Sequence, residues 1–188
     1  MFERVREDYR THGGLCPGFW ALLVHHFGAW RYTVRPRALR APFYVLYRVA
    51  FTAVQMCTGI ELPCEVKLGR RFKIEHHSDI IINGTAEFGD DVIIRNGVTV
   101  GVRHTDEAGS PVVGNRVDIG AGAKVLGAIR IGDDVAIGAN AVVITDVPSG
   151  SLAVGVPARV IPRAPAARAA TAPGAASDAA RDSAGRVC

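Results

Sequence analysis

The sequence lacks the short motifs that mark several large classes of enzyme. It has neither a Walker-type phosphate loop nor a G-x-G-x-x-G pattern, so nucleotide hydrolysis and dinucleotide redox chemistry are unsupported. None of its 4 cysteines is spaced as a zinc knuckle or a C-x-x-C pair, which predicts reduced, unpaired thiols in a cytoplasmic protein. No basic stripe with interleaved aromatics accompanies the formal charge of +4, so no nucleic-acid partner is expected.

Signals for export and membrane insertion are also missing. The chain opens with the charged stretch MFERVREDYR, which does not resemble a secretory signal. The most apolar run, APFYVLYRVAFTAVQMCTGI, has about the length of a membrane span, but Arg48 lies at its middle and Gln55 near its end. We therefore predict a packed helix and no transmembrane segment, while peripheral contact with a membrane stays open.

Three regions differ in composition. Residues 1–63 show helical periodicity and are predicted to form an N-terminal α-helical region. Residues 64–162 are dominated by aliphatic residues followed by glycine. Residues 163–188, rich in Ala, Arg, Pro, Ser and Asp, cannot bury a core and are predicted to be a disordered tail.

A six-residue period runs through the middle region. Aliphatic residues recur at Val113, Ile119, Val125, Ile131, Ile137 and Val143, and a second apolar register follows each by four positions. An earlier run at Leu68, Ile74 and Ile80 slips by two residues near NGTAEF and resumes at Phe88. This period predicts a hexapeptide β-helix with aliphatic residues inside and small residues at the corners, rather than a sandwich. The polar stretch 102–111 interrupts the period and is predicted to be an extruded loop.

The segments GAGAKVLG and AVGVPARVI, within residues 64–161, resemble the serine acetyltransferase family. Within that family, APFYVLYRV and GRRFKI are similar to the colanic acid acetyltransferases of exopolysaccharide clusters. The resemblance implies a mainly β protein, a left-handed parallel β-helix. It also implies a homotrimer with acetyl-CoA, the acetyl donor, in a groove between neighbouring solenoids.

The stretch FKIEHHSDIIING carries the candidate catalytic residues. The family's acid–histidine pair falls on Glu75 and His76, although the family usually has Asp at the first position. A neutral imidazole suits removal of the hydroxyl proton as that oxygen attacks a thioester, and a carboxylate can orient the ring. Taken without the resemblance, the triplet is better explained by a surface or interface histidine with no role in proton transfer. Metal binding by Glu75, His76 and His77 is disfavoured because adjacent residues rarely converge on one ion, so no metal is expected.

The acceptor side departs from the family pattern. Serine acetyltransferases usually carry an Arg-His pair at the end of the loop, where this chain has Gly109 and Ser110. Arg103 and His104, earlier in the loop, are candidate replacements or merely solvated residues. The resemblance also assigns an acceptor contact to a helical-region Asp, which best matches Asp8.

Candidate acetyl-CoA contacts are spread along the repeat. The resemblance places the pantetheine arm beside backbone groups of small residues, which predicts Gly101, Ala121 and Ala139. Lys124 and Arg159 are candidates for the phosphates. Ordinary corner or exposed positions would explain these five residues nearly as well.

Together these features predict an acetyl-CoA-dependent O-acetyltransferase. The missing Arg-His pair favours a saccharide acceptor, a sugar hydroxyl in exopolysaccharide biosynthesis, over L-serine in cysteine biosynthesis. N-acetylation of an amino sugar is less favoured. A non-catalytic trimeric scaffold and a zinc solenoid of the carbonic-anhydrase kind are the alternatives from other classes.

Overall fold

The structure is a computed structural model that describes residues 1–104 and 109–163. Most of the predicted tail and the middle of the predicted loop lie outside the described residues. Helical segments come first: α1 (Phe2–His12), α2 (Pro17–Arg31), the 3₁₀ turn η1 (Arg37–Leu39) and α3 (Arg40–Thr58). Proline at the first position of α2 and left-handed glycines after α1 and α3 set these limits. None of the described helices is long and apolar enough to span a bilayer.

Short strands occupy the rest of the described chain, beginning shortly before the predicted boundary at residue 64. They are β1 (Ile60–Glu61), β2 (Lys67–Leu68), β3 (Lys73–Ile74), β4 (Ile80–Ile82), β5 (Glu87–Phe88), β6 (Ile93–Ile94), β7 (Thr99–Gly101), β8 (Val112–Val113), β9 (Asp118–Ile119), β10 (Lys124–Leu126), β11 (Arg130–Ile131), β12 (Ala136–Ile137), β13 (Val142–Val143), β14 (Ser151–Val154) and β15 (Arg159–Pro162).

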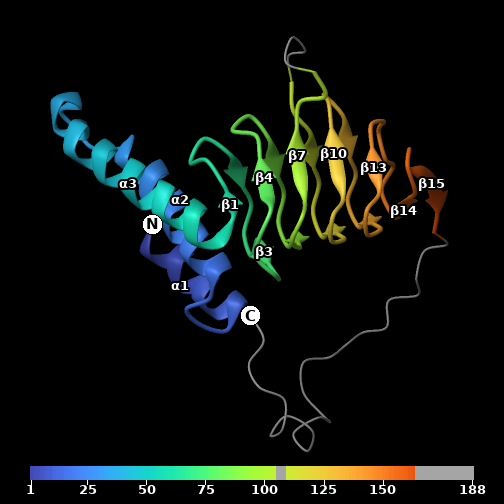
Figure 1. Cartoon of the computed structure of the whole chain (residues 1–188), viewed down its shortest axis with the longest axis horizontal. Coiled ribbons are helices and arrows are strands. Elements are labelled where there is room, and N and C mark those ends of the chain that lie inside the picture. Colours follow the sequence, from blue (N-terminus) through green and yellow to red (C-terminus); the bar gives the residue numbers. More distant parts are fainter. Residues whose placement is uncertain (105–108, 164–188) are drawn as a thin grey trace, which may run out of the picture.

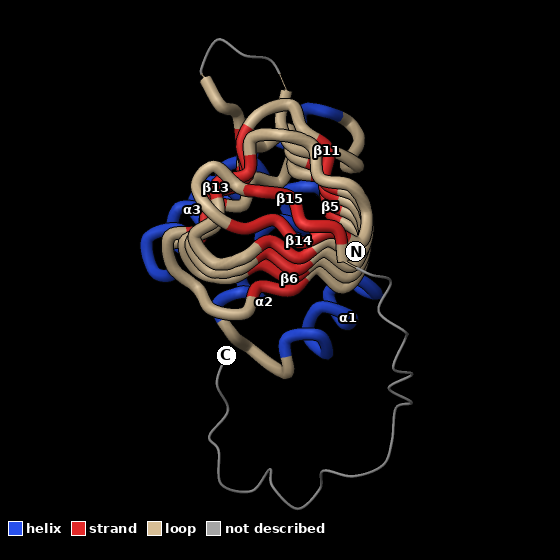
Figure 2. Tube along the Cα trace, turned by 90° about the vertical axis from the view of Figure 1, so that its right-hand side faces the viewer, coloured by secondary structure: helices blue, strands red, loops and turns tan. Residues whose placement is uncertain are grey.

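The strands form three sheets that the chain visits in rotation. Their orders are β1-β4-β7-β10-β13, β11-β8-β5-β2 and β15-β14-β12-β9-β6-β3. Neighbouring strands are parallel except β14 and β15, which close the last sheet as an antiparallel pair. The chain therefore winds in successive three-strand coils, with the helices at the end where β1 lies (Figures 1 and 2).

The six-residue registers predicted from the sequence line the inside of these coils. All members of both registers are buried: Val113, Ile119, Val125, Ile131, Ile137 and Val143 in the first, and Val117, Ala123, Ile129, Val135, Ala141 and Val147 in the second. Each two-residue strand turns one side chain inward and the other toward solvent, as a pleated strand must. The predicted interior is thus confirmed.

The predicted position of the two-residue slip is wrong. Strand pairing aligns Ile74 with Ile94 and Ile82 with Val100. The chain therefore advances eight residues from Ile74 to Ile82 in the first coil, but only six residues from Ile94 to Val100 in the next coil. The extra residues lie in the corner 75–79 and not near NGTAEF, because Ile80 and Ile82 both point inward and either could continue the period.

Candidate functional site

One corner of the coils repeats the same backbone hydrogen bond from turn to turn. The N–H groups of Gly97, Gly122 and Asn140 donate to the carbonyl oxygens of Ser78, Asn96 and Ala121, at 3.0, 2.8 and 2.8 Å respectively. Asp79 and the three donor residues all have left-handed φ values, between 52° and 74°. These residues form a continuous column, which we call the corner column.

His76 and His77 are the inserted residues at the helix end of the corner column. Both are exposed, and His76 has a φ of 54°. Ser78 follows with a φ of 96°. Left-handed backbone at residues other than glycine carries a strain cost, and such strain concentrates at functional positions. The insertion lifts the two imidazoles out of the regular corner, so they are accessible to a ligand in the single chain.

Glu75 is held by cations of its own chain. Its carboxylate lies 3.0 Å from Lys73 Nζ and 3.0 Å from a terminal nitrogen of Arg95. The hydrogen bond from Lys73 lowers the pKa of Glu75, and Arg95 acts in the same direction. Within the described chain Glu75 makes no hydrogen bond to His76: both residues lie in the corner that follows β3, and the carboxylate is directed to Lys73 and Arg95.

Asp8 is buried rather than exposed. Its carboxylate accepts a hydrogen bond from His26 Nε2 at 2.7 Å, joining α1 to α2. His12, one turn after Asp8, connects the same helix to the strand that leads into the site. Its Nε2 accepts the N–H of Ile74 at 3.1 Å, and its Nδ1 lies 2.9 Å from the carbonyl oxygen of Asp8.

Burial is the largest effect on the imidazole of His12 and lowers its pKa. A neutral ring fits the geometry, because a ring nitrogen that faces a backbone N–H must be unprotonated. His12 and His26 were not predicted from the sequence. The spacing of Asp8 and His12 on one helical face was the only available signal, and it does not identify Ile74 as the partner.

The predicted acceptor loop is described only at its two ends. Arg103 and His104 are exposed where the chain leaves β7. At the other end Ser110 is buried, with its hydroxyl 2.7 Å from that of Thr85 and 3.0 Å from Asn83 Oδ1. The position where serine acetyltransferases usually have histidine is therefore used here to fasten the loop to the neighbouring coil.

Of the five candidate acetyl-CoA residues, only two lie at equivalent corners of the coils. Ala121 and Ala139 occupy equivalent corners of successive coils, on the corner column, and Ala139 is exposed. Gly101 is buried at the end of β7, and Arg159 is exposed on β15. The ammonium group of Lys124 donates hydrogen bonds within its own chain, to Gly97 O at 2.6 Å and to Thr99 Oγ1 at 3.0 Å.

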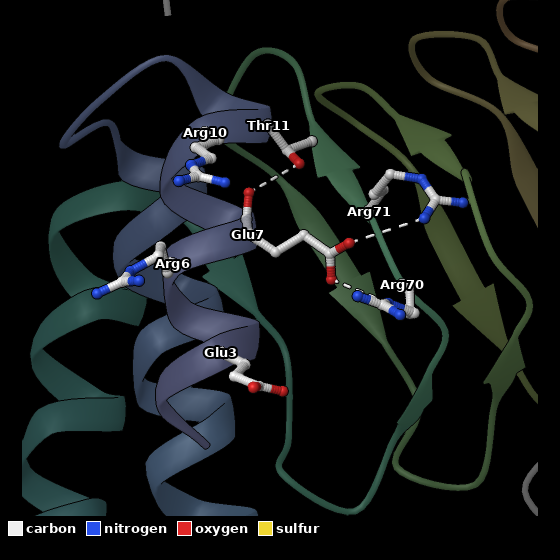
Figure 3. A pocket seen from close by; sticks show the side chains of 7 residues that line it. All are labelled: Glu3, Arg6, Glu7, Arg10, Thr11, Arg70 and Arg71. Atoms are coloured by element: carbon white, nitrogen blue, oxygen red, sulfur yellow. Dashed lines mark hydrogen bonds and ion pairs between the residues drawn. The ribbon is translucent and has the colours of Figure 1, made fainter.

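A hollow of about 540 Å³ lies elsewhere, between α1 and a different corner of the coils. Glu7 crosses it and reaches Arg70 at 3.1 Å and Arg71 at 3.7 Å (Figure 3). Its lining does not include His76, so we assign it to the anchoring of α1. Within the described part of the chain no three His, Cys, Asp or Glu side chains gather as a metal site.

Known proteins resemble this chain in sequence and structure. A serine acetyltransferase of Helicobacter pylori strain J99 is 44% identical over 154 residues, which cover 78% of this chain and 82% of that protein. An Escherichia coli K12 protein named as the colanic acid biosynthesis acetyltransferase WcaB is 39% identical over 161 residues, covering 85% of this chain and 98% of that protein.

Structural comparison agrees. A crystal structure of the Brucella abortus serine acetyltransferase in complex with coenzyme A matches with a TM-score of 0.74 and 26% identity, over 86% of this chain and 67% of the other. No family model matches the chain. The sequence identities and coverage nevertheless establish that the chain belongs to the serine acetyltransferase family and is an acyltransferase.

Proposed function

We propose that this protein transfers the acetyl group of acetyl-CoA to a sugar hydroxyl in the biosynthesis of a colanic-acid-like exopolysaccharide. The observation that carries the proposal is the inserted corner. It exposes His76 at the end of the same column that presents Ala121 and Ala139. A base and small-residue backbone positions for the donor therefore lie along one edge of the molecule.

In the proposed reaction His76 acts as general base. The neutral imidazole takes the acceptor's hydroxyl proton while that oxygen attacks the thioester carbonyl. The carbon–sulfur bond then breaks, the imidazolium returns the proton to the leaving thiolate, and an acetyl ester and free coenzyme A result. A rigid corner holding the base near the thioester supplies much of the rate through positioning.

Glu75 is proposed as the supporting carboxylate. Its pairing with Lys73 and Arg95 keeps it ionised, so it can stabilise a transient imidazolium charge. We propose that the coils form a left-handed β-helix and that three copies assemble in the cytoplasm, with acetyl-CoA between them. In such a trimer the carboxylate and the imidazole can come from different subunits.

The acceptor assignment depends on the loop. Ser110 carries a neutral hydroxyl, bonded to Thr85 and Asn83, so this position offers no cation for a carboxylate such as that of L-serine. The E. coli relative named for colanic acid biosynthesis matches over nearly its whole length, which also supports a saccharide. L-Serine is the second candidate, because the H. pylori relative is named for that activity. Arg103 and His104, both exposed, are the residues proposed to meet either acceptor. Asp8 is buried and bonded to His26, so we do not propose it as an acceptor contact.

The test is thiol release from acetyl-CoA by the purified protein, with L-serine and with exopolysaccharide-derived saccharides in parallel. We expect saccharide-dependent turnover that falls about 10²–10⁴-fold in His76→Ala. His77→Ala is the matched control, since it removes a neighbouring imidazole that is also exposed.

Each other outcome points to a different conclusion. Turnover with L-serine alone would overturn the saccharide assignment and give the acceptor role to Arg103 and His104. Equal losses of turnover in both histidine variants would refute the assignment of His76 as the general base. No turnover with any acceptor, and no effect of either substitution, would favour a trimeric scaffold.

A further inference from the structure

Helix α3 is apolar on two opposite faces, but only one of them is covered. Tyr47 is buried against the rest of the protein at 4% exposure. On the other side Val45, Leu46, Val49 and Met56 are 60, 56, 63 and 83% exposed. At 100° per residue these four side chains lie within one stripe. A helix that is apolar all round is normally buried, so this stripe, the α3 outer face, lacks its partner in the single chain.

The α3 outer face is bordered by arginines with no acidic neighbours in sequence. Residues 9–60 contain no Asp or Glu. Arg35, Arg37 and Arg40, just before or at the start of α3, line a hollow of about 550 Å³, and exposed Arg48 flanks the stripe. Arg40 donates to the carbonyl oxygen of Val34, but none of these four arginines forms an ion pair with a residue that the structure describes.

We propose that the α3 outer face and its arginines dock the protein on an anionic phospholipid membrane. Lipid phosphates would bind Arg35, Arg37 and Arg40, while the exposed aliphatic side chains enter the boundary between headgroups and acyl chains. A second copy of the chain is a poorer occupant. Two such faces packed on each other would bring like charges together with no carboxylate from residues 9–60 between them.

The same helix leads directly to the proposed site. Gly59 follows α3, and its carbonyl oxygen accepts the N–H of Ile80 at 3.0 Å. A Cβ added to Gly59 would come within 3.0 Å of Asp79 N and 3.2 Å of Ser78 Cα, so the end of α3 abuts the corner that carries His76. The helix has 19 residues and spans about 28 Å.

Docking would therefore hold this corner at or near the bilayer surface. This step rests on the proposed function and deepens it: the acceptor is a saccharide carried on a membrane lipid.

The test is co-sedimentation of the full chain with vesicles of phosphatidylcholine alone and of phosphatidylcholine mixed with phosphatidylglycerol. We expect binding only to the anionic vesicles, weakened by added salt. Arg35→Gln/Arg37→Gln should lower the affinity about 25-fold, at about five-fold per arginine near an anionic surface. The control, Arg6→Gln/Arg130→Gln, removes the same charge from exposed positions elsewhere and should change binding far less.

A second variant tests the apolar stripe. Leu46→Gln/Val49→Gln replaces two exposed side chains with good helix formers, so the fold should persist while membrane binding falls. If wild type binds neither vesicle and this variant lowers the molecular mass in sedimentation, the face is a contact between copies and the proposal is overturned. Equal loss in both arginine variants would also overturn it, because net charge alone would then explain binding.

The assays separate the two proposals. Saccharide-dependent thiol release without vesicle binding refutes the docking surface alone. Vesicle binding without thiol release from any saccharide refutes the proposed function alone.

Discussion

Acidification should destabilise the fold through the buried imidazole of His25. This side chain is 4% exposed, and its Nε2 lies 3.0 Å from the carbonyl oxygen of Val66. A carbonyl only accepts, so Nε2 carries the proton and Nδ1 is the basic atom. Nδ1 is itself buried and has no hydrogen-bond partner among residues 1–104 and 109–163. Protonating it places a charge where no acceptor is available, which is the costly case for a buried polar group.

The size of the effect follows from linkage between protonation and folding. Burial, the largest cause, lowers the pKa of His25 from 6.5 to about 4. Between these values the unfolded chain binds a proton that the folded chain does not, so stability falls as the pH falls. The contribution is fully present above pH 6.5 and is lost by about pH 4. At 1.36 kcal/mol per pKa unit, its loss amounts to about 3 kcal/mol.

The assay is urea unfolding followed by circular dichroism between pH 7 and pH 4, at one fixed protein concentration. His25→Gln is the informative variant, because an amide can still donate to Val66 O but does not titrate. It should show a flatter dependence of the free energy of unfolding on pH. His12, whose pKa is also lowered by burial, stays in both proteins and cancels in the comparison. Parallel curves for the two proteins would refute the reasoning.

Three further substitutions test the packing of the coils. Ile119→Ala empties a position with 0% exposure and should cost about 2–5 kcal/mol, read from the urea midpoint; a cost below about 1 kcal/mol would contradict the packed interior. Gly122→Ala, at a φ of 74°, adds a Cβ against the side chain of Asn140, whereas Gly150→Ala, at a φ of 70°, adds one into open space. Both should lose about 1 kcal/mol to backbone strain, with a further loss only at Gly122; equal losses would exclude the contact.

Much of the coil architecture could be predicted from the sequence because its period is local. An inward residue every six positions requires no knowledge of distant contacts, and the registers from Val113 to Val147 are buried as that period predicts. The extruded loop could also be predicted, because its polar residues interrupt two periodic stretches. A regular coil has 18 residues, and the pairing of Phe88 with Val113 shows that this coil has seven more. The additional residues belong to the coil in which the loop was predicted.

The corner that carries His76 could not be located in the same way. Ile80 and Ile82 are both apolar, so counting from either one gives a consistent period, and only the pairing of Ile82 with Val100 decides between them. The links from Asp8 to His26 and from His12 to Ile74 join residues separated by 18 and 62 positions. Such contacts depend on how the helices pack on the first coil, which no local pattern contains.

The two inserted histidines lie outside the hydrogen bonds and the packed interior that stabilise the coil. On one side of it Glu75 N donates to Ile94 O at 3.0 Å, and on the other Ile80 N donates to Gly59 O at 3.0 Å. The coil is thus closed by regular hydrogen bonds before and after the two exposed histidines, and neither imidazole packs in the interior. Replacing His76 should therefore leave the fold intact, so a loss of acetyl transfer in that variant reports on proton transfer and not on unfolding.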